Sequence, residues 1–270
     1  MAESLKQRIK SGELVKGTFL LFSGGVDFPV FLKGLGFDFF VLDLEHSWFD
    51  LAKTRETISA ARGAGISCIV RIPEIQYHFV ARILDAGADG IMLPRTETRL
   101  EAEKLVEFGR YRPQGKRGIT TFAGHNDFKK PSDVPEFLAG KNRDIILMTQ
   151  IETVQGVKNR EKILSVPGID ACFIGPGDLA MGMGHAGNTN HKDVVREVRK
   201  VIDCARKRGL ICSLPILSPD QIGFWIKAGL NMLTLGMDSL LFAAGASLFM
   251  KEAQKLLGKK AKSRRISAAE

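Results

Sequence analysis

The chain has 270 residues, of which 44% are apolar, and a formal net charge of +9. This length suits one large hydrophobic core, and every apolar run is shorter than the roughly 18–20 residues of a membrane helix. The N-terminal sequence MAESLKQRIKSGE predicts a short amphipathic helix and lacks the apolar core of a secretory signal. We therefore expect a cytoplasmic globular protein without a membrane segment.

Eight short apolar segments are predicted to be strands, and several of them lack polar alternation, as strands buried on both faces of a parallel sheet do. They cover residues 16–22, 37–45, 66–72, 90–94, 144–152, 170–176, 210–216 and 231–237. Amphipathic segments lie between them and predict helices. These cover residues 27–33, 51–64, 75–86, 97–109, 153–165, 191–208, 219–228 and 239–257.

A weak internal repeat supports this alternation. Four strands are preceded by Gly-x-Asp or Gly-x-Asn, starting at Gly36, Gly87, Gly168 and Gly229. Glycine suits the left-handed position that ends a helix, and Asp or Asn suits the tight turn into a strand. We therefore predict an α/β fold, a single (β/α)8 TIM barrel over residues 1–258 with an N-terminal helix and a long C-terminal helix. One long irregular stretch, residues 111–131, interrupts the pattern.

The basic segment KKAKSRR at 259–265 contributes much of the net charge. We expect residues 259–270 to be a solvated, disordered tail. A nucleic-acid-binding patch is the alternative, but no aromatic residues or binding motif accompany the charges, so nucleic acid is not favoured as a partner. The four separated cysteines are expected to be buried, reduced thiols, and no clustered Cys or His has the short spacing of a zinc site.

Ionisable side chains close two neighbouring strands. The second strand ends with Asp43, Glu45 and His46, and the third ends with Arg71. Function in a barrel of this kind gathers at the carboxyl ends of the strands. Arg71 needs an anion because a guanidinium keeps its charge. That anion is either a ligand or one of the carboxylates Asp43 and Glu45, and the sequence leaves both interpretations open.

The fifth and sixth strands each deliver a carboxylate to the same rim. Gln150 and Glu152 share one face at the end of the fifth strand, and Asp178 lies in the turn Gly-Pro-Gly-Asp after the sixth. Two oxygen ligands with open positions suit Mg²⁺ or Mn²⁺. The alternative is that Asp178 only caps the following segment. A phosphate cradle is not favoured, because the segments after the last two strands are not glycine-rich.

Several separated motifs resemble the HpcH/HpaI aldolase family, the metal-dependent pyruvate aldolases that act on 4-hydroxy-2-oxo acids, such as 4-hydroxy-2-oxoheptanedioate or 2-keto-3-deoxy sugar acids. They occur in order over about half the chain. The motifs are GFDFFVLDLEH, VRIP, LDAGADGIMLP, RPQGKRG, QIET and GIDACFIGPGDLA.

The resemblance implies a role for each matching residue. Glu152 and Asp178 correspond to the ligands of a divalent metal, Mg²⁺ or Mn²⁺ with Co²⁺ as a further candidate. His46 corresponds to the acid/base, and Arg71 to the residue that binds the 2-oxo oxygen and stabilises the enolate. The backbone N–H groups of Gly177 and Asp178 correspond to a cradle for the substrate carboxylate.

Other matching positions have supporting roles. Gln150, Asp43 and Glu45 correspond to partners of metal-bound water. Asp85 corresponds to a partner of the histidine, but its place near the end of a helix means that it would have to act in a neighbouring subunit. The family typically forms hexamers, so a homo-oligomer is expected.

The chain departs from the family pattern at three positions. Trp48 and Phe49 replace smaller residues after the Glu-His pair, and Gly177 stands where alanine or asparagine is more usual. We expect the two aromatic side chains to narrow the entrance or to reshape the aldehyde pocket.

The chemistry implied by this resemblance is a class II aldol cleavage or addition, between pyruvate enolate and an aldehyde. A Schiff-base aldolase would instead require a lysine at the site. Two alternatives of other kinds remain. One is a related metal-enolate enzyme, such as an acyl-CoA lyase or a decarboxylase, and the other is a non-catalytic oligomeric or nucleic-acid-binding protein.

Overall fold

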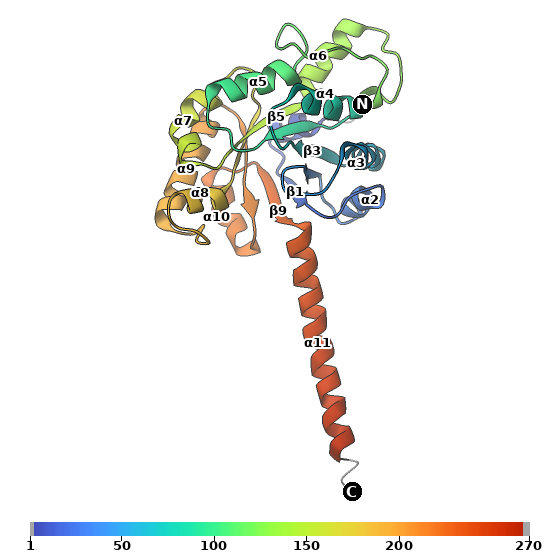
Figure 1. Ribbon diagram of the computed structural model, residues 1–270, viewed down its shortest axis with the longest axis vertical. Coiled ribbons are helices and arrows are strands. Elements are labelled where there is room, and N and C mark those ends of the chain that lie inside the picture. Colours follow the sequence, from blue (N-terminus) through green and yellow to red (C-terminus); the bar gives the residue numbers. More distant parts are fainter. Residues whose placement is uncertain (1–2, 267–270) are drawn as a thin grey trace.

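The computed structural model describes the backbone of residues 3–266 and the side chains of residues 3–257. A parallel sheet curls into a barrel, with strands in the order β7-β6-β5-β4-β3-β2-β1-β9-β8 (Figure 1). Its strands are β1 (Val15–Leu20), β2 (Phe39–Asp43), β3 (Ser67–Arg71), β4 (Gly90–Leu93), β5 (Ile146–Ile151), β6 (Ala171–Ile174), β7 (Ile211–Ser213), β8 (Pro215–Ile216) and β9 (Met232–Met237). Only Leu214 separates β7 from β8, so these two are the predicted seventh strand with a break. The predicted TIM-type barrel is confirmed.

The predicted helices are also found. They are α1 (Leu5–Lys10), α2 (Asp27–Gly34), α3 (Leu51–Ala64), α4 (Tyr77–Ala86), α5 (Arg99–Gly109), α7 (Val154–Leu164), α9 (Lys192–Lys207), α10 (Ile222–Ala228) and α11 (Asp238–Ile266). A short 3₁₀ turn, η2 (Pro219–Gln221), precedes α10 and accounts for the start of its predicted segment.

Three further elements were not predicted from the sequence. They are η1 (Gly124–Asn126), α6 (Val134–Asp144) and α8 (Pro176–Gly182). The side chain of Asp133 caps α6 by accepting from the N–H of Glu136, and a proline lies in its first turn. That cap was the signal in the sequence that could have revealed α6.

The Gly-x-Asp/Asn repeat has a defined structural role at the amino-terminal end of the barrel. In each copy the glycine adopts a positive φ, between 85° and 115°. The Asp or Asn then accepts a hydrogen bond from a backbone N–H of the preceding strand, at 2.8–2.9 Å. The acceptors are Asp38, Asp89, Asp170 and Asn231. The repeat therefore ties the start of one strand to the start of its neighbour.

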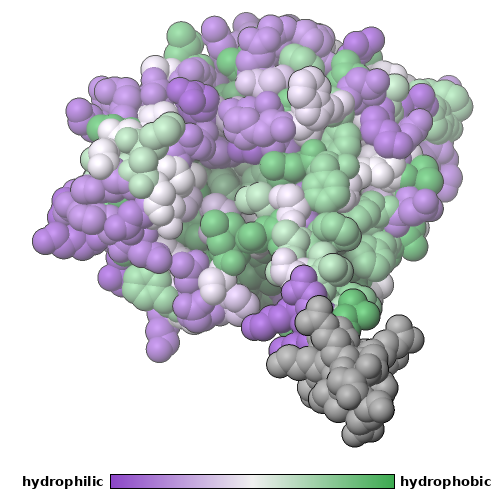
Figure 2. All heavy atoms as spheres, turned by 60° about the horizontal axis from the view of Figure 1, so that its bottom comes forward, coloured by the Kyte–Doolittle hydropathy of each residue, from purple (hydrophilic) through white to green (hydrophobic). Residues whose placement is uncertain are grey.

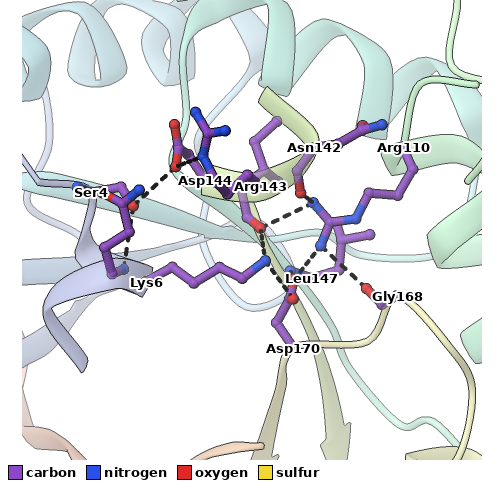
Figure 3. A network of polar contacts seen from close by, with 11 residues as sticks. Ser4, Lys6, Arg110, Asn142, Arg143, Asp144, Leu147, Gly168 and Asp170 are labelled. Carbon is purple, nitrogen blue, oxygen red and sulfur yellow. Dashed lines mark hydrogen bonds and ion pairs between the residues drawn. The ribbon is translucent and has the colours of Figure 1, made fainter. Parts of the chain in front are cut away.

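A buried ion network closes the same end of the barrel (Figure 3). Asp170 accepts from Lys6 Nζ of α1 at 2.6 Å and also binds the guanidinium of Arg110. Arg110 donates further hydrogen bonds to three backbone oxygens, those of Asn142, Ile145 and Gly168. The N-terminal helix is thereby anchored across the bottom of the barrel.

Helix α11 does not cover the barrel as an eighth helix should. It leaves the end of β9 and projects into solvent as a rod (Figure 1). The helix extends to Ile266, and the side chains from residue 258 on lie outside the described part of the chain. That residues 259–270 form a solvated, disordered tail stays a prediction. No helix in the described part of the chain is long and apolar enough to cross a membrane. All four cysteines are free and buried, as predicted.

Candidate active site

Strand parity carries the polar residues into the barrel. On β2, Phe39 and Val41 belong to the apolar cluster inside the barrel, and Asp43 follows them on the same face. On β3, Arg71 follows Ile69 in the same way, and the sheet register places it directly beside Asp43. Each strand therefore begins with apolar side chains inside the barrel and ends with a charged one.

Arg71 is held by a fully buried carboxylate. Its Nε lies 2.8 Å from Asp43 Oδ1 and its Nη2 lies 2.5 Å from Asp43 Oδ2. Its Nη1 lies 3.1 Å from Glu45 Oε2, and its guanidinium stacks over the Phe19 ring at 5.0 Å from the centroid. Such a bidentate pair fixes the direction of the arginine. The structural ion pair left open by the sequence therefore exists, and Arg71 still reaches the cavity.

His46 lies at the rim. Its Nε2 is 3.7 Å from Glu45 Oε2, and about 60% of its side chain is exposed. Burial raises the pKa of Glu45, while the positive charges of Arg71 and His46 oppose this shift. Glu45 therefore links the histidine at the rim to the arginine inside the cavity.

Glu152 and Gln150 form the opposite wall. Glu152 is almost fully buried and accepts hydrogen bonds from Gln150 Nε2 and from the N–H of Arg95. A side chain at Gly175 would collide with it, since an added Cβ would come within 2.5 Å of Glu152 Oε2. Burial raises the pKa of Glu152, and the nearby carboxylates Glu45 and Asp178 raise it further.

Asp178 is exposed in the first turn of α8, the short helix that begins directly after β6. Gly177 precedes it, with open space where a Cβ would stand. The helix start directs backbone N–H groups toward the end of the barrel. The sequence had suggested only a turn at this position.

These residues surround one cavity of about 360 Å³. Figure 2 looks toward this end of the molecule and shows the hollow with hydrophobic side chains at its rim. Of the predicted site residues, the lining includes His46, Arg71, Gln150, Glu152, Gly177 and Asp178. Asp43 and Glu45 stand behind Arg71.

Part of the cavity wall was not predicted from the sequence. Its apolar part includes Phe19, Phe173, Leu214, Trp225 and Met237, and its polar rim includes Thr189, Asn190 and Gln221. Phe19, Phe173 and Met237 end or nearly end their strands, so strand position was a usable signal for them. Nothing local distinguishes the three rim residues.

The donor set fits a divalent cation with oxygen ligands. The carboxylates of Glu45 and Asp178 both lie close enough to Glu152 to raise its pKa, and Arg71 contacts Glu45. The buried Gln150 Oε1 has no hydrogen-bond partner among the described residues. Hard oxygen donors with surplus negative charge suit Mg²⁺ or Mn²⁺.

Asp85 does not join this site within the chain. It lies at the end of α4, pairs with Arg117 at 2.5 Å and lines a separate pocket that also includes Phe122 and Phe128.

The expectation that Trp48 and Phe49 narrow the entrance or reshape the aldehyde pocket was wrong within one chain. Trp48 is fully exposed, Phe49 packs beside Gly24, and neither lines the cavity.

Comparisons with known proteins point to one family. The family model "HpcH/HpaI aldolase/citrate lyase" matches residues 30–244. A 5-keto-4-deoxy-D-glucarate aldolase of Salmonella arizonae is 34% identical over 78% of this chain and 81% of its own. A hydroxypyruvate/pyruvate aldolase of Roseovarius nubinhibens is 32% identical over 90% and 93%.

The fold comparison covers nearly the whole chain. The crystal structure of an HpcH/HpaI aldolase from Desulfitobacterium hafniense superposes with a TM-score of 0.90 at 30% identity, over 94% of this chain and 97% of the other. The residues that the family model matches include Asp43, Arg71 and Glu152. The chain therefore belongs to the HpcH/HpaI aldolase/citrate lyase family, and it is a carbon–carbon lyase.

Proposed function

We propose that this enzyme is a divalent-metal-dependent aldolase that forms or cleaves a 4-hydroxy-2-oxo acid through a pyruvate enolate and an aldehyde. One observation carries the proposal. Glu152 and Asp178 share a cavity with Arg71, whose guanidinium is locked by Asp43. Two carboxylates that could hold a cation therefore line the same cavity as the fixed positive charge of Arg71. The cavity, at about 360 Å³, is large enough for a small 2-oxo acid.

Arg71 acts on the oxygen where negative charge develops. Its donors are already oriented by Asp43, so no reorganisation is needed when the 2-oxo oxygen gains charge. The Phe19 ring beneath the guanidinium and the apolar walls around it keep this region poor in water. A low local dielectric strengthens the interaction of the guanidinium with an enolate oxygen.

His46 is placed to move a proton at the 4-hydroxyl group. It stands at the rim beside the Glu45 carboxylate, where the aldehyde part of the substrate would extend. The histidine takes the hydroxyl proton in cleavage and returns it in addition.

Glu152 and Asp178 would hold the metal, with Gln150 in support. When bound, a divalent cation supplies Lewis-acid polarisation of the 2-oxo acid. The N–H groups of Gly177 and Asp178 would receive the substrate carboxylate. Mg²⁺ and Mn²⁺ are the first candidates, and Co²⁺ is a third.

The cavity does not favour Schiff-base chemistry. No lysine is found among the described residues that line it. A Schiff-base aldolase needs a lysine amine in contact with the 2-oxo group. Borohydride with pyruvate should therefore leave the enzyme active, and covalent trapping of pyruvate would contradict the proposal.

The deciding experiment follows hydrogen–deuterium exchange at the methyl group of pyruvate by NMR. We expect exchange that requires Mg²⁺ or Mn²⁺ and stops with a chelator. Hydroxypyruvate is the second donor to test, because one relative is named for it. Absence of exchange with every divalent metal would reject the pyruvate chemistry and favour a related lyase acting on an acyl-CoA.

We also propose a homo-oligomer in which α11 of one copy covers the barrel of another. Helix α11 carries exposed Phe242, Leu248 and Phe249, and α2 exposes Val30 and Phe31. The helix that should cover this flank of the barrel projects away from it (Figure 1). Each copy therefore has both an unoccupied apolar helix and an uncovered apolar flank.

Such an assembly gives the predicted role of Asp85 a physical basis, since a partner could bring its own Asp85 toward His46. Fully exposed Trp48, two residues from His46, would lie near that contact. The hexameric state and the cytoplasmic location remain predictions.

A further inference from the structure

A second group of metal-binding side chains lies outside the catalytic cavity. His185, His191 and Asp193 each offer one ligand atom, and these atoms all lie within 4.8 Å of one another. His185 belongs to the loop after α8, and His191 is the N-cap residue of α9. The sequence did not predict this group, because its two histidines are six residues apart and lack the short spacing of a zinc site.

The loop backbone brings the two imidazoles together. Asn188 N–H donates to the His185 oxygen at 2.9 Å, and His191 N–H donates to the Asn188 oxygen at 3.1 Å. These two turns stack the histidine rings with centroids 3.6 Å apart and an angle of 18° between their planes.

Asp193 completes the group. Its Oδ2 lies 4.0 Å from His185 Nε2 and 3.6 Å from His191 Nδ1. His191 Nδ1 accepts the Asp193 N–H at 3.3 Å, so a metal on this nitrogen would replace that N-cap hydrogen bond. Its other oxygen is held by Arg196 Nη1 at 2.6 Å, as outer partners commonly hold a ligating carboxylate. About 30% of each side chain is exposed, which leaves room for water to complete a coordination shell.

We propose that His185, His191 and Asp193 form a peripheral site for Zn²⁺ or another imidazole-binding transition metal, distinct from the catalytic cation. Two imidazole nitrogens and one carboxylate favour Zn²⁺, Co²⁺ or Ni²⁺, whereas the all-oxygen set at Glu152 and Asp178 favours Mg²⁺ or Mn²⁺. Ligand atoms lie about 3.3 Å apart around tetrahedral zinc. The Asp193 oxygen, at 4.0 Å from His185 and 3.6 Å from His191, must therefore approach each histidine by less than about 1 Å.

The site also has a consequence for the cavity. Thr189 and Asn190, which lie between the two histidines in sequence, line the catalytic cavity, and Asn190 Oδ1 accepts from Gln221 Nε2 at 3.4 Å. A metal that joins His185 to His191 would close the loop into a ring and fix these two residues. Metal binding on the outside would thereby stiffen the rim of the active site.

The test uses the full chain with Glu152→Gln and Asp178→Asn, which removes the catalytic ligands and makes the result independent of the proposed function. We expect this protein to retain one Zn²⁺ per chain after dialysis, measured by elemental analysis. Adding His185→Gln should abolish binding, and the matched exposed variant His78→Gln should not. His191→Asn keeps an N-cap residue and should also abolish binding. Equal zinc content with and without His185 would overturn the site.

The effect on the loop is measured separately by amide hydrogen exchange. With Zn²⁺ present, the amides of Asn188 and His191 should exchange at least tenfold more slowly, and His185→Gln should remove this protection. Zinc binding without any change in their exchange would overturn the proposed stiffening of the rim. Folding of each variant is checked by its thermal midpoint beside that of His78→Gln.

Discussion

Arg71 shows how a buried pair can serve chemistry rather than stability. Taking Asp43 and Arg71 out of water costs several kcal/mol per ion, and their mutual attraction offsets this only with good geometry. The two hydrogen bonds at 2.8 and 2.5 Å provide that geometry. What the pair adds is a fixed direction for the guanidinium, which lines the cavity where we propose that the 2-oxo oxygen binds.

The first prediction follows from this orientation. Arg71→Lys keeps the positive charge but loses the bidentate contact with Asp43, so metal-dependent exchange of pyruvate should fall by about 10²–10³-fold. Arg99→Lys, on the exposed face of α5, is the control and should leave the rate unchanged. A rate within threefold of the parent enzyme for Arg71→Lys would contradict the enolate role.

Asp89 gives a prediction about stability and pH. Burial raises the pKa of Asp89 from 3.8 to about 6, although the Cys68 N–H and the charge of Arg62 act in the opposite direction. The folded state thus holds its proton more tightly than the unfolded state. The contribution of Asp89 to stability is therefore fully present below pH 4 and is lost as the pH rises through 6.

The expected loss is at most about 3 kcal/mol, since two pKa units correspond to that free energy. Asp89→Asn keeps an acceptor for the Cys68 N–H and cannot ionise. Urea unfolding at pH 4 and pH 8 should show the variant gaining stability relative to the parent at pH 8. The same difference between the two proteins at both pH values would contradict this prediction.

At the level of elements, the weak internal repeat supported the strand and helix prediction that the apolar runs gave. Each Gly-x-Asp/Asn copy precedes a strand, and all four glycines adopt a positive φ. Gly36, Gly87 and Gly229 lie at the end of a helix, whereas Gly168 comes four residues after the last residue of α7. The apolar runs gave the strands, because a barrel strand is buried on both faces. The short helices α6 and α8 lacked comparable periodicity and were not predicted.

The turn before β9 tests the repeat directly. Gly229 ends α10 with φ at +115°, and an added Cβ would approach the Arg206 side chain to 2.2 Å. Gly229→Ala should therefore lower the free energy of unfolding by about 1–3 kcal/mol. The matched control is Gly223→Ala within α10, where nothing blocks a Cβ. It should be neutral or raise stability by up to about 1 kcal/mol. Equal stability of the two variants would contradict the argument.

The candidate site was predictable to the extent that it lies at strand ends. Asp43, Arg71 and Glu152 follow directly from their strands, and Asp178 from the turn after β6. Thr189, Asn190 and Gln221 reach the rim through loops, and only tertiary packing places them there. The pairing of Asp85 with Arg117 likewise depends on the long loop 111–131, whose path has no periodic pattern in the sequence.

At the scale of the whole molecule, α11 is the element that a single chain leaves unexplained. A helix in water derives most of its stability from packing, and an isolated one gains little. Leu241, Leu248 and Leu256 recur at spacings of seven and eight along α11, which places them on one stripe. We expect this stripe to pack on a second copy, and the exposed Val30 and Phe31 of α2 offer an apolar surface for it.

The last prediction concerns this packing. Phe242→Glu with Phe249→Glu places two charges in the proposed contact between α11 and a second copy. The charges would lose their hydration there, so light scattering should show a shift from an oligomer toward the 29.7 kDa monomer. Lys255→Glu reverses a charge at an exposed position of the same helix and should keep the parent mass. If Asp85 acts across the contact, dissociation should also slow the exchange of pyruvate, although every other site residue is intact. An unchanged mass for the double variant would show that α11 does not join the copies, and the role of Asp85 would then need another explanation.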